Sequence, residues 1–291
     1  MSIAFPGERG AFSELAAKEY FGDEQRTVAY SEFEQVFQAV KDGEHTFGIV
    51  PIENSFAGSI YQNYDFLLES GLNIAGEIYL RIHHHLMANK GCTINSIKQV
   101  YSHPQAFAQC KQFLRNKFSK DDLISYPSTA LAVKKIREEK LENVAAVASM
   151  QAAIDYDMDL LASNIEDNKA NTTRFLALSK KMGTKESAQM KTSIVFSIKN
   201  IPGALFKALS VFALREIDLY KIESRPVLNR GFEYLFYLDF KGDIRSSVSM
   251  KAVSHLQEIT TFYRLLGSYP VGDVVEPRYR GRIENEKKKE A

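Results

Sequence analysis

Apolar residues along the first 180 positions fall into short β-rich runs that alternate with helical patterns. Ile60, Tyr64 and Leu68, for example, repeat at helical spacing after an apolar run at 47–51. Alternation of this kind is typical of a mostly parallel sheet covered by helices. We therefore expect an α/β fold over residues 1–180. Its strands are predicted at residues 2–5, 47–51, 97–101, 144–148 and 173–178.

The second half of the chain has a different rhythm. Residues 180–191 are polar and have no apolar period, so we place a linker there. Over 191–270 the pattern predicts strand, helix, two strands, helix and strand, which is the ferredoxin-like βαββαβ motif. The aromatic residues of 232–240 lie on one side of its third strand and are interpreted as core. Residues 271–291 are assigned to a C-terminal tail, and its charged end at 284–291 is expected to be frayed.

Composition narrows the class of protein. The 291 residues fit two domains better than one. The 37 Lys and Arg nearly balance the 36 Asp and Glu, so we expect neither a nucleic acid nor a membrane surface as partner. The two cysteines cannot build a disulfide framework and suit a reducing compartment. Since the N-terminus lacks a signal-peptide pattern and no apolar stretch approaches ~18 residues, we predict a cytoplasmic protein that binds a small ligand.

Polar side chains gather where predicted strands end, which is where open α/β sheets bind ligands. The strand that ends at Pro51 runs into Glu53, Asn54, Ser55 and Ser59. This turn offers a carboxylate, an amide and two hydroxyls ahead of a helix, and it suits an anionic group. An ordinary helix cap is the alternative.

Two further polar clusters adjoin later predicted strands. Ser102 precedes a helix that contains Gln109. Ser102 and its neighbour His103 form no catalytic triad because adjacent side chains diverge, and a capping role is favoured for Ser102. At the entrance of another strand, Thr173 offers a hydroxyl and Arg174 can bind a carboxylate through two hydrogen bonds. A surface arginine beside β-favouring threonines is the alternative.

Two other patterns are weaker. In a strand the outer members of the triplet at 83–85, all histidines, would share a face, but no Cys/His spacing completes a metal site, so we predict no metal. Gly7 and Gly10 follow the first strand like half of a dinucleotide fingerprint, but the first glycine and a ribose-binding acid are missing. A loop with close backbone approach is the favoured interpretation.

Six short segments, in order along both halves, form a more specific pattern than any one of them. Those of the first half are Gly7-x-x-Gly10-Ala11-Phe12-Ser13-Glu14, Pro51-Ile52-Glu53-Asn54-Ser55, Ser102-His103-Pro104-Gln105-Ala106 and Asn171-x-Thr173-Arg174-Phe175. Those of the second half are Gly203-Ala204-Leu205 and Glu223-Ser224-Arg225-Pro226. With them the chain closely resembles prephenate dehydratase over residues 1–180, joined to an ACT regulatory domain over 191–270.

The resemblance implies conversion of prephenate to phenylpyruvate, water and carbon dioxide, without a metal or an organic cofactor. The driving force lies in the substrate, because loss of its ring carboxylate and hydroxyl yields an aromatic ring. The family's catalytic threonine falls on Thr173, which would donate a hydrogen bond or a proton to the departing hydroxyl. The resemblance further suggests Glu53 as a titratable catalytic group, Asn54 and Gln109 as polar catalytic groups, and Ser55, Ser59, Ser102 and Arg174 for substrate binding.

The resemblance also implies an architecture and a regulation. The catalytic region would have two lobes around a cleft, similar to periplasmic binding proteins, with chain crossings near 75–80 and 150–160. Paired ACT domains imply a homodimer or homotetramer, inhibited by the end product L-phenylalanine as allosteric effector. The effector pocket would be lined by Gly203, Ala204, Leu205, Glu223, Ser224, Arg225 and Pro226.

Two alternatives remain open. Arogenate dehydratase shares these motifs but acts on the amino form of the substrate, and relative kcat/KM separates the two activities. A non-catalytic amino-acid sensor would combine the same cleft with an ACT domain. The polar groups of Glu53, Asn54, Gln109, Thr173 and Arg174 exceed what a phenylalanine sensor needs.

Overall fold

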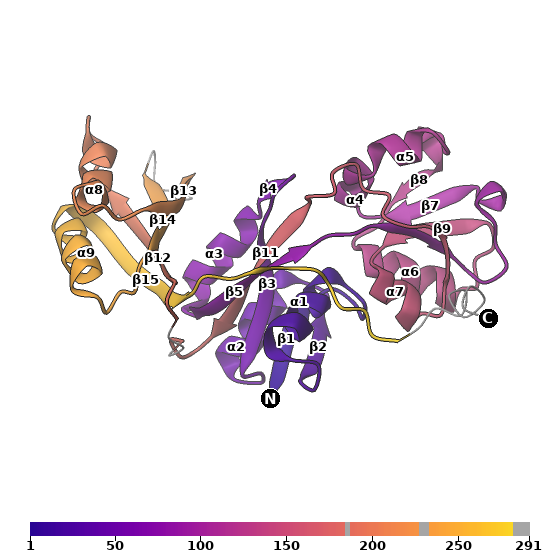
Figure 1. The fold of residues 1–291 in the computed structure, drawn as a ribbon, viewed down its shortest axis with the longest axis horizontal. Helices are drawn as coiled ribbons and strands as arrows, with labels where there is room; N and C mark the ends of the chain where they lie inside the picture. Colours follow the sequence, from indigo (N-terminus) through magenta and orange to yellow (C-terminus); the bar gives the residue numbers. More distant parts are fainter. Residues whose placement is uncertain (184–186, 227–232, 282–291) are drawn as a thin grey trace. The chain divides into compact units, whose positions relative to one another are not determined.

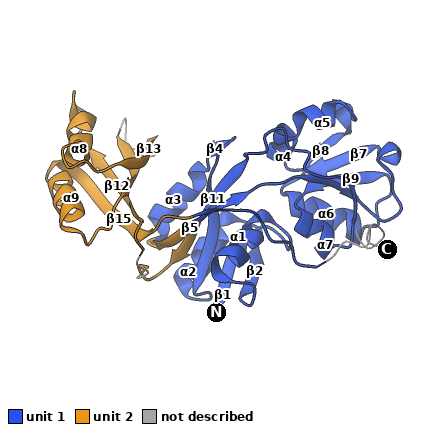
Figure 2. Ribbon diagram, in the orientation of Figure 1, with its two compact units in different colours: residues 1–70, 78–176, 273–291 blue, residues 71–77, 177–272 orange. Residues whose placement is uncertain are grey.

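The computed structural model of the chain describes residues 1–183, 187–226 and 233–281. They form two compact units, which Figure 2 shows in different colours. Unit 1 contains Met1–Ser70, Ile78–Leu176 and the segment that begins at Asp273, and unit 2 contains Gly71–Glu77 and Ala177–Gly272. Both units combine helices with sheets, so the predicted α/β class is confirmed.

Unit 1 has two lobes, each built on its own sheet. The strands of the first sheet are β1 (Ser2–Pro6), β2 (Arg26–Tyr30), β3 (Phe47–Asn54), β4 (Gly58–Ser59), β5 (Asn73–Arg81), β11 (Thr172–Ser179) and β16 (Val274–Val275). They follow the order β16-β5-β11-β3-β1-β2, with β4 paired to β3. Figure 1 labels the strands of this sheet other than β16. β1 is parallel to both β2 and β3. The helices of this lobe are α1 (Phe12–Phe21), α2 (Phe33–Asp42) and α3 (Tyr61–Ser70).

The apolar pattern explains the first lobe. Phe5 of β1 and Ile49 of β3 are buried in one cluster with Leu15 of α1. α2 begins with a capping box, in which the side chains of Glu32 and Gln35 each accept a hydrogen bond from the backbone N–H of the other residue. These local signals fix where the helices begin, and burial of their apolar faces fixes how they lie on the sheet.

The second lobe contains five strands and four α-helices. Its strands are β6 (His85–Ala88), β7 (Gln99–Ser102), β8 (Leu123–Ser125), β9 (Val144–Ala148) and β10 (Asp159–Ala162), in the order β10-β6-β9-β7-β8. Its helices are α4 (Pro104–Gln109), α5 (Lys111–Arg115), α6 (Thr129–Glu138) and α7 (Met150–Asp155), with 3₁₀ turns η1 (Ile94–Ser96) and η2 (Lys120–Asp122). Every residue of β9 is buried, as expected for a central strand with both faces covered.

The chain passes between the two sheets later than we predicted. It leaves the first sheet after Arg81 and enters the second at His85, whereas we expected a crossing near 75–80. It returns between Ala162 and Thr172 rather than near 150–160. The apolar alternation of β5 continues through residue 82, and β10 pairs with β6 before the chain turns back, so both crossings move toward the C-terminus.

The segment that begins at Asp273 packs against unit 1, although we assigned 271–291 to a tail. β16 pairs in parallel with β5. Arg278 donates from Nε to Glu19 Oε2 on α1 at 2.8 Å, and the backbone N–H of Arg280 donates to Gln151 Oε1 on α7 at 2.8 Å. The segment therefore contacts both lobes, and the tail prediction is wrong for 273–281. The charged run at 284–291 lies outside the described residues.

Unit 2 has the predicted ferredoxin-like order. Its elements are β12 (Met190–Ile198), α8 (Ala204–Ala213), β13 (Leu219–Pro226), β14 (Tyr234–Lys241), α9 (Ser247–Ile259) and β15 (Thr260–Pro270). The four strands pair antiparallel in the order β13-β14-β12-β15. Leu238 and Phe240 of the predicted aromatic stripe are buried in the core with Phe196 and Phe212, whereas Tyr234 is exposed and Phe232 lies outside the described residues.

The predicted linker is shorter than 180–191. β11 ends at Ser179 and β12 begins at Met190, with 184–186 outside the described residues. Lys191, which we assigned to the linker, lies in β12 with a fully buried side chain. Its Nζ is 2.6 Å from Oε1 of Glu77. A pattern of apolar and polar positions counts lysine as polar, so it cannot predict a lysine that is buried because a carboxylate neutralises it.

Candidate active site

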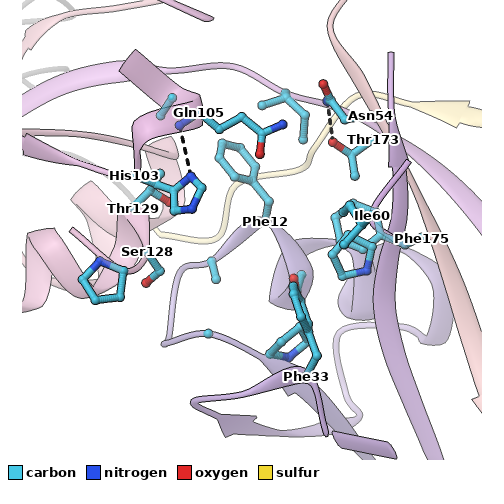
Figure 3. A pocket seen from close by; sticks show the side chains of 18 of the residues that line it. Phe12, Phe33, Asn54, Ile60, His103, Gln105, Ser128, Thr129, Thr173 and Phe175 are labelled. Carbon is cyan, nitrogen blue, oxygen red and sulfur yellow. Dashed lines mark hydrogen bonds between the residues drawn. The ribbon is translucent and has the colours of Figure 1, made fainter. Parts of the chain in front are cut away.

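Residues of both lobes of unit 1 line a cavity of about 390 Å³ (Figure 3). This volume lies within the range typical of small-molecule sites. Part of the wall is apolar and is formed by Phe12, Phe33, Ile60 and Phe175. Amide, hydroxyl and imidazole groups form another part, and they belong to Asn54, Gln109, Thr173, His84 and His103.

The first residues of four helices meet in this cavity. The lining includes Phe12 of α1, Phe33 of α2, Gln105 of α4 and Thr129 of α6. Helix N-termini present unpaired N–H groups and the positive end of the helix dipole. Among the described residues that line the cavity there is neither arginine nor lysine. The dipoles of these helices supply positive potential at the wall, beside the carboxylate of Glu32, which also lines it.

The glycine loop after β1 brings the two lobes close together. Gly10 has φ +80°, and a Cβ there would lie 2.7 Å from the Cα of Ala152 on α7. Ser149 donates from Oγ to the carbonyl oxygen of Gly10 at 2.5 Å. The predicted close backbone approach is confirmed, and Gly7 of the same loop lines the cavity.

Three of the predicted catalytic residues belong to one buried hydrogen-bond network. Asn54, at the end of β3, donates from Nδ2 to Thr173 Oγ1 at 2.9 Å and to Asn171 Oδ1 at 2.8 Å (Figure 3 shows the bond to Thr173). Gln109, at the end of α4, donates from Nε2 to Asn54 Oδ1 at 3.2 Å. All four side chains are buried. The network links the second lobe to the threonine on the first.

The histidine triplet supplies a group that sequence reasoning missed. His84, which we considered only as a metal ligand, is buried, lines the cavity and lies with Nε2 2.7 Å from Gln109 Oε1. Burial lowers the pKa of His84, so its imidazole is held neutral. His83 instead lies with Nδ1 2.9 Å from Glu166 and Nε2 2.8 Å from Glu276. The sequence offered one signal for His84, namely that this histidine lies in the segment between two strands.

His103 is a second missed residue. It is the N-cap of α4, and its Nδ1 accepts a hydrogen bond from the backbone N–H of Gln105 at 3.2 Å (Figure 3). Burial lowers its pKa. In the neutral ring the proton must then be on Nε2. The cap that we predicted at Ser102 is thus formed by the next residue.

The structure separates three predicted residues near β3 from the cavity wall. Glu53 and Ser59 face each other across the β3–β4 ladder, and neither lines the cavity. Side chains alternate along a strand, so Glu53 lies on the opposite face from its neighbour Asn54. Ser55 is exposed, and its Oγ accepts a hydrogen bond from the backbone N–H of Thr172 at 3.0 Å. These residues shape the end of β3; the catalytic role of Glu53 gains no support from the cavity wall and stays a prediction.

Ser102 and Arg174 are also absent from the wall, so their predicted roles in substrate binding gain no support from it and stay predictions. Ser102 is fully buried and donates from Oγ to the carbonyl oxygen of Val147 at 2.6 Å. Arg174 alternates with Thr173 along β11 and so points to the other face. Its guanidinium carbon lies 6.0 Å from the centroid of the Tyr79 ring. Both side chains stabilise the fold around the site.

A smaller hollow of about 280 Å³ lies in unit 2 at the N-terminus of α8. Gly203, Ala204 and Leu205 line it, and Gly203 caps α8 with φ +78°. Tyr234 and Phe236 of β14 complete the wall. Glu223, Ser224, Arg225 and Pro226 lie on the adjacent strand β13 but are not part of this wall, and Pro226 and Ser224 face Tyr234 and Phe236 in register.

Among the described residues, no group of three or more His, Cys, Asp or Glu side chains is placed to hold a metal ion. None of the helices in residues 1–183, 187–226 and 233–281 has the length and apolar character needed to span a membrane.

Comparisons with known proteins agree on one family. The family model for prephenate dehydratase matches residues 3–183. Arogenate dehydratase/prephenate dehydratase 2, chloroplastic, of Arabidopsis thaliana is 44% identical over 283 residues, which cover 92% of this chain and 72% of the relative.

Two solved structures resemble the whole fold. Prephenate dehydratase from Arthrobacter aurescens in complex with L-Phe has a TM-score of 0.85 and 29% identity, covering 93% of this chain and 90% of that chain. A protein described as GqqA, a novel type of quorum quenching acylase, has a TM-score of 0.85 and 30% identity, covering 93% of this chain and 98% of that chain. With a family model over more than half its length and a relative at 44% identity, the chain belongs to the prephenate dehydratase family and is a dehydratase.

Proposed function

We propose that this protein converts prephenate to phenylpyruvate, with Thr173 as the residue that stabilises the departing hydroxyl. The supporting observation is the position of Thr173 in the wall of a cavity that residues at the starts of four helices also line, where Asn54 donates a hydrogen bond to its Oγ1. Prephenate has two carboxylates, and the helix dipoles provide favourable potential for both. The apolar wall of Phe12, Phe33 and Phe175 suits its six-membered ring.

The reaction breaks two bonds of the substrate at once or in sequence. The bond between the ring and its carboxylate breaks, its electron pair enters the ring, and the C4–O bond breaks with its pair leaving on oxygen. The prephenate dianion plus one proton gives phenylpyruvate anion, carbon dioxide and water. Charge builds up on the leaving oxygen, so a hydroxyl donor there lowers the barrier.

Threonine is a weak acid, and the proton that completes water needs a titratable source or solvent. Glu53 does not line the cavity, so the geometry does not favour it for this role. His103 lines the cavity and, in its neutral form, has its proton on Nε2, the nitrogen that Gln105 does not engage. We propose that this N–H donates a hydrogen bond in the cavity and that solvent supplies the proton that completes water.

The test is formation of phenylpyruvate from prephenate by the purified chain and by two matched variants. Thr173→Val removes the hydroxyl and should lower kcat about 10²–10³-fold, the usual loss for one transition-state donor. Thr172→Val removes the neighbouring hydroxyl, whose Oγ1 donates to Ala170 and does not line the cavity, and should keep kcat near the wild-type value. Equal turnover by both variants would contradict the role of Thr173.

Arogenate is the second candidate substrate, and one residue of the wall favours it. Glu32 lines the cavity at the start of α2, and a carboxylate there suits the ammonium of arogenate better than the ketone of prephenate. The name of the Arabidopsis relative includes both activities. The ratio of kcat/KM for the two substrates, measured on wild type and Glu32→Gln, decides: an arogenate enzyme should lose its preference in the variant.

We further propose that L-phenylalanine inhibits the enzyme through unit 2. The hollow at the α8 N-terminus has the size of a small ligand, and helix N–H groups suit an amino-acid carboxylate. The Arthrobacter relative was solved with L-Phe. Exposed Leu205, Phe206 and Leu214 on and after α8 support pairing of this unit in a homodimer or homotetramer. Inhibition by L-phenylalanine that is unchanged in Arg225→Ala would remove β13 from the site.

A cytoplasmic location stays a prediction. The Arabidopsis relative is named as chloroplastic. Fractionation of the native cells, followed by detection of the chain in each fraction, provides the measurement.

A further inference from the structure

The orientation of the Asn54 amide is fixed by the backbone beside it. Its Oδ1 lies 3.0 Å from the backbone nitrogens of both Phe56 and Ala57, and both N–H groups donate to it. Those two donors require an oxygen, so the amide cannot be turned over. Nδ2 must therefore face Thr173 and Asn171, as the distances of 2.9 and 2.8 Å show.

The fixed Asn54 amide determines the next two groups. Gln109 lies with one amide atom 3.2 Å from Asn54 Oδ1, and because that oxygen only accepts, the atom is Nε2. Gln109 Oε1 then faces Nε2 of His84 at 2.7 Å. A carbonyl oxygen only accepts as well, so the hydrogen must be on Nε2 of His84.

The same logic applies at the other end of the chain of hydrogen bonds. An amide nitrogen donates and does not accept, so Thr173 Oγ1 is the acceptor from Asn54 Nδ2. The hydrogen of the Thr173 hydroxyl is then left for another acceptor, and Thr173 lines the cavity. Every bond from His84 to Thr173 thus runs in one direction and ends with a hydroxyl that is a donor toward the substrate.

We propose that His84 is a positioning residue: in its neutral Nε2–H form it starts a directed chain of hydrogen bonds through Gln109 and Asn54 that makes Thr173 a donor. This inference rests on the proposed role of Thr173. Nδ1 of His84 is buried and has no hydrogen-bond partner among the described residues, as expected when it carries no proton.

The surroundings of His84 hold it in this form. Its ring packs edge-on against Phe12, with centroids 5.4 Å apart. Its backbone N–H donates to Glu166 Oε2 at 2.9 Å, and Glu166 also pairs with His83. Burial lowers the pKa of His84, while the bond to Gln109 and the charge of Glu166 act in the other direction and the charge of His83 lowers the pKa further.

A first experiment reads the proton on His84 without any substrate. Nitrogen-15 NMR of the full chain, with labelled histidine, reports which ring nitrogen carries hydrogen, and loss of one pair of signals in His84→Gln assigns them. We expect hydrogen on Nε2, none on Nδ1, and a pKa below the ordinary value of 6.5. Hydrogen on Nδ1, or a pKa above 6.5, would overturn the proposal. Because this readout needs no turnover, it stands even if prephenate is not the substrate.

A second experiment tests the action of His84 through Thr173. His84→Phe fills the space without a donor and should lower kcat about 100-fold with KM changed less than about threefold, because the reacting hydroxyl is misplaced while binding groups remain. His84→Gln can place an amide N–H near the same point and should recover most of the loss. His85→Phe is the matched control, since His85 is equally buried but does not line the cavity, and should leave kcat unchanged.

A double-mutant comparison separates positioning from general damage. If His84 acts through Thr173, His84→Phe should have little further effect in a Thr173→Val background, because the directed hydroxyl is already gone. A full 100-fold loss in both backgrounds would overturn the proposal. Wild-type inactivity on both prephenate and arogenate, with the expected NMR result, would instead refute the proposed function and leave the geometry of the chain of hydrogen bonds standing.

Discussion

Lys191 and Glu77 form an ion pair inside unit 2, and breaking it should destabilise that unit strongly. The exposed fractions of the two residues are 2% and 3%, and Nζ lies 2.6 Å from Oε1. The same carboxylate oxygen accepts the backbone N–H of Gly272 at 3.1 Å. The ammonium also lies 4.7 Å from the centroid of the Tyr220 ring. Both charges are thus desolvated and rely on each other.

The expected magnitude follows from this burial. Lys191→Met keeps much of the apolar stem but leaves a buried carboxylate without its counter-ion, which costs about 3–5 kcal/mol of unfolding free energy. Glu77→Leu should cost a similar amount, because it leaves the buried ammonium of Lys191 without its counter-ion. The double variant buries no charge, so its stability should lie within about 2 kcal/mol of wild type. The coupling energy between the two sites, the sum of the single losses minus the loss in the double variant, should then be about 4 kcal/mol or more.

Urea unfolding of the full chain provides the measurement. The sequence has no tryptophan, so far-ultraviolet circular dichroism and tyrosine fluorescence are the suitable signals. Lys221→Met is the matched control, because Lys221 pairs with Glu223 at 3.3 Å in the same unit with side chains 13% and 20% exposed. That substitution should cost no more than about 1 kcal/mol. A loss below about 1 kcal/mol in Lys191→Met, or full additivity in the double variant, would refute the reasoning.

Three further outcomes are expected. Gly10→Ala should destabilise the protein by more than about 2 kcal/mol, because φ is +80° and the new Cβ meets the Ala152 backbone; Gly58→Ala, with the same φ and open space, is the control in thermal unfolding. Although burial lowers the pKa of His83, hydrogen bonds and charges of its two glutamate partners raise it overall above 6.5. The stabilisation that protonated His83 contributes to the folded state is then complete below pH 6.5 and is lost as the pH rises through the raised pKa. His83→Gln should flatten this part of the plot of stability against pH. Burial raises the pKa of the Cys110 thiol, so that residue should resist alkylation at about pH 8 until the protein unfolds, which mass spectrometry can follow.

Most of the helices and strands could be predicted from the sequence because their signals are local. Alternation marked the strands of unit 2, and helical spacing marked α8 and α9, so the βαββαβ order was correct. The ends of the strands did not follow from this order: β15 spans Thr260–Pro270 because it pairs with the full length of β12. Where a strand ends depends on its partner, which lies far away in the sequence, so the residues of one strand do not determine its ends.

The larger errors concern residues whose partners are far along the chain. Lys191 is polar by type but is buried because Glu77, more than a hundred positions earlier, neutralises it. The segment after Asp273 has little apolar pattern, yet Arg278 and Arg280 anchor it through Glu19 and Gln151. No local rule connects such residues, and charge patterns favour the interpretation of an exposed linker or tail.

At the candidate site, too, part of the prediction agrees with the geometry and part does not, and here the difference arises between neighbouring residues of one strand. Motif resemblance selected neighbours together, Glu53 with Asn54 and Thr173 with Arg174, but alternation sends one member of each pair to the cavity and the other away from it. For Thr173 the resemblance and the periodicity agree. For Arg174 they conflict, and the four helix N-termini supply the positive potential that we had assigned to its guanidinium.

The direction of the hydrogen bonds at the site has a local origin that the sequence does contain. After β3 the chain turns so that two successive backbone N–H groups, of Phe56 and Ala57, donate to the Asn54 side chain. Asparagine is suited to such a turn, because its side-chain oxygen can bond the backbone two residues on. That turn alone orients the amide, and the amide in turn leaves the Thr173 hydroxyl as a donor while it requires a proton on Nε2 of His84. A turn preference of one residue thus determines the protonation of a histidine in the segment that joins the two lobes. Replacing Asn54 by Asp should reverse the donor role at Thr173, since a carboxylate accepts where the amide donates.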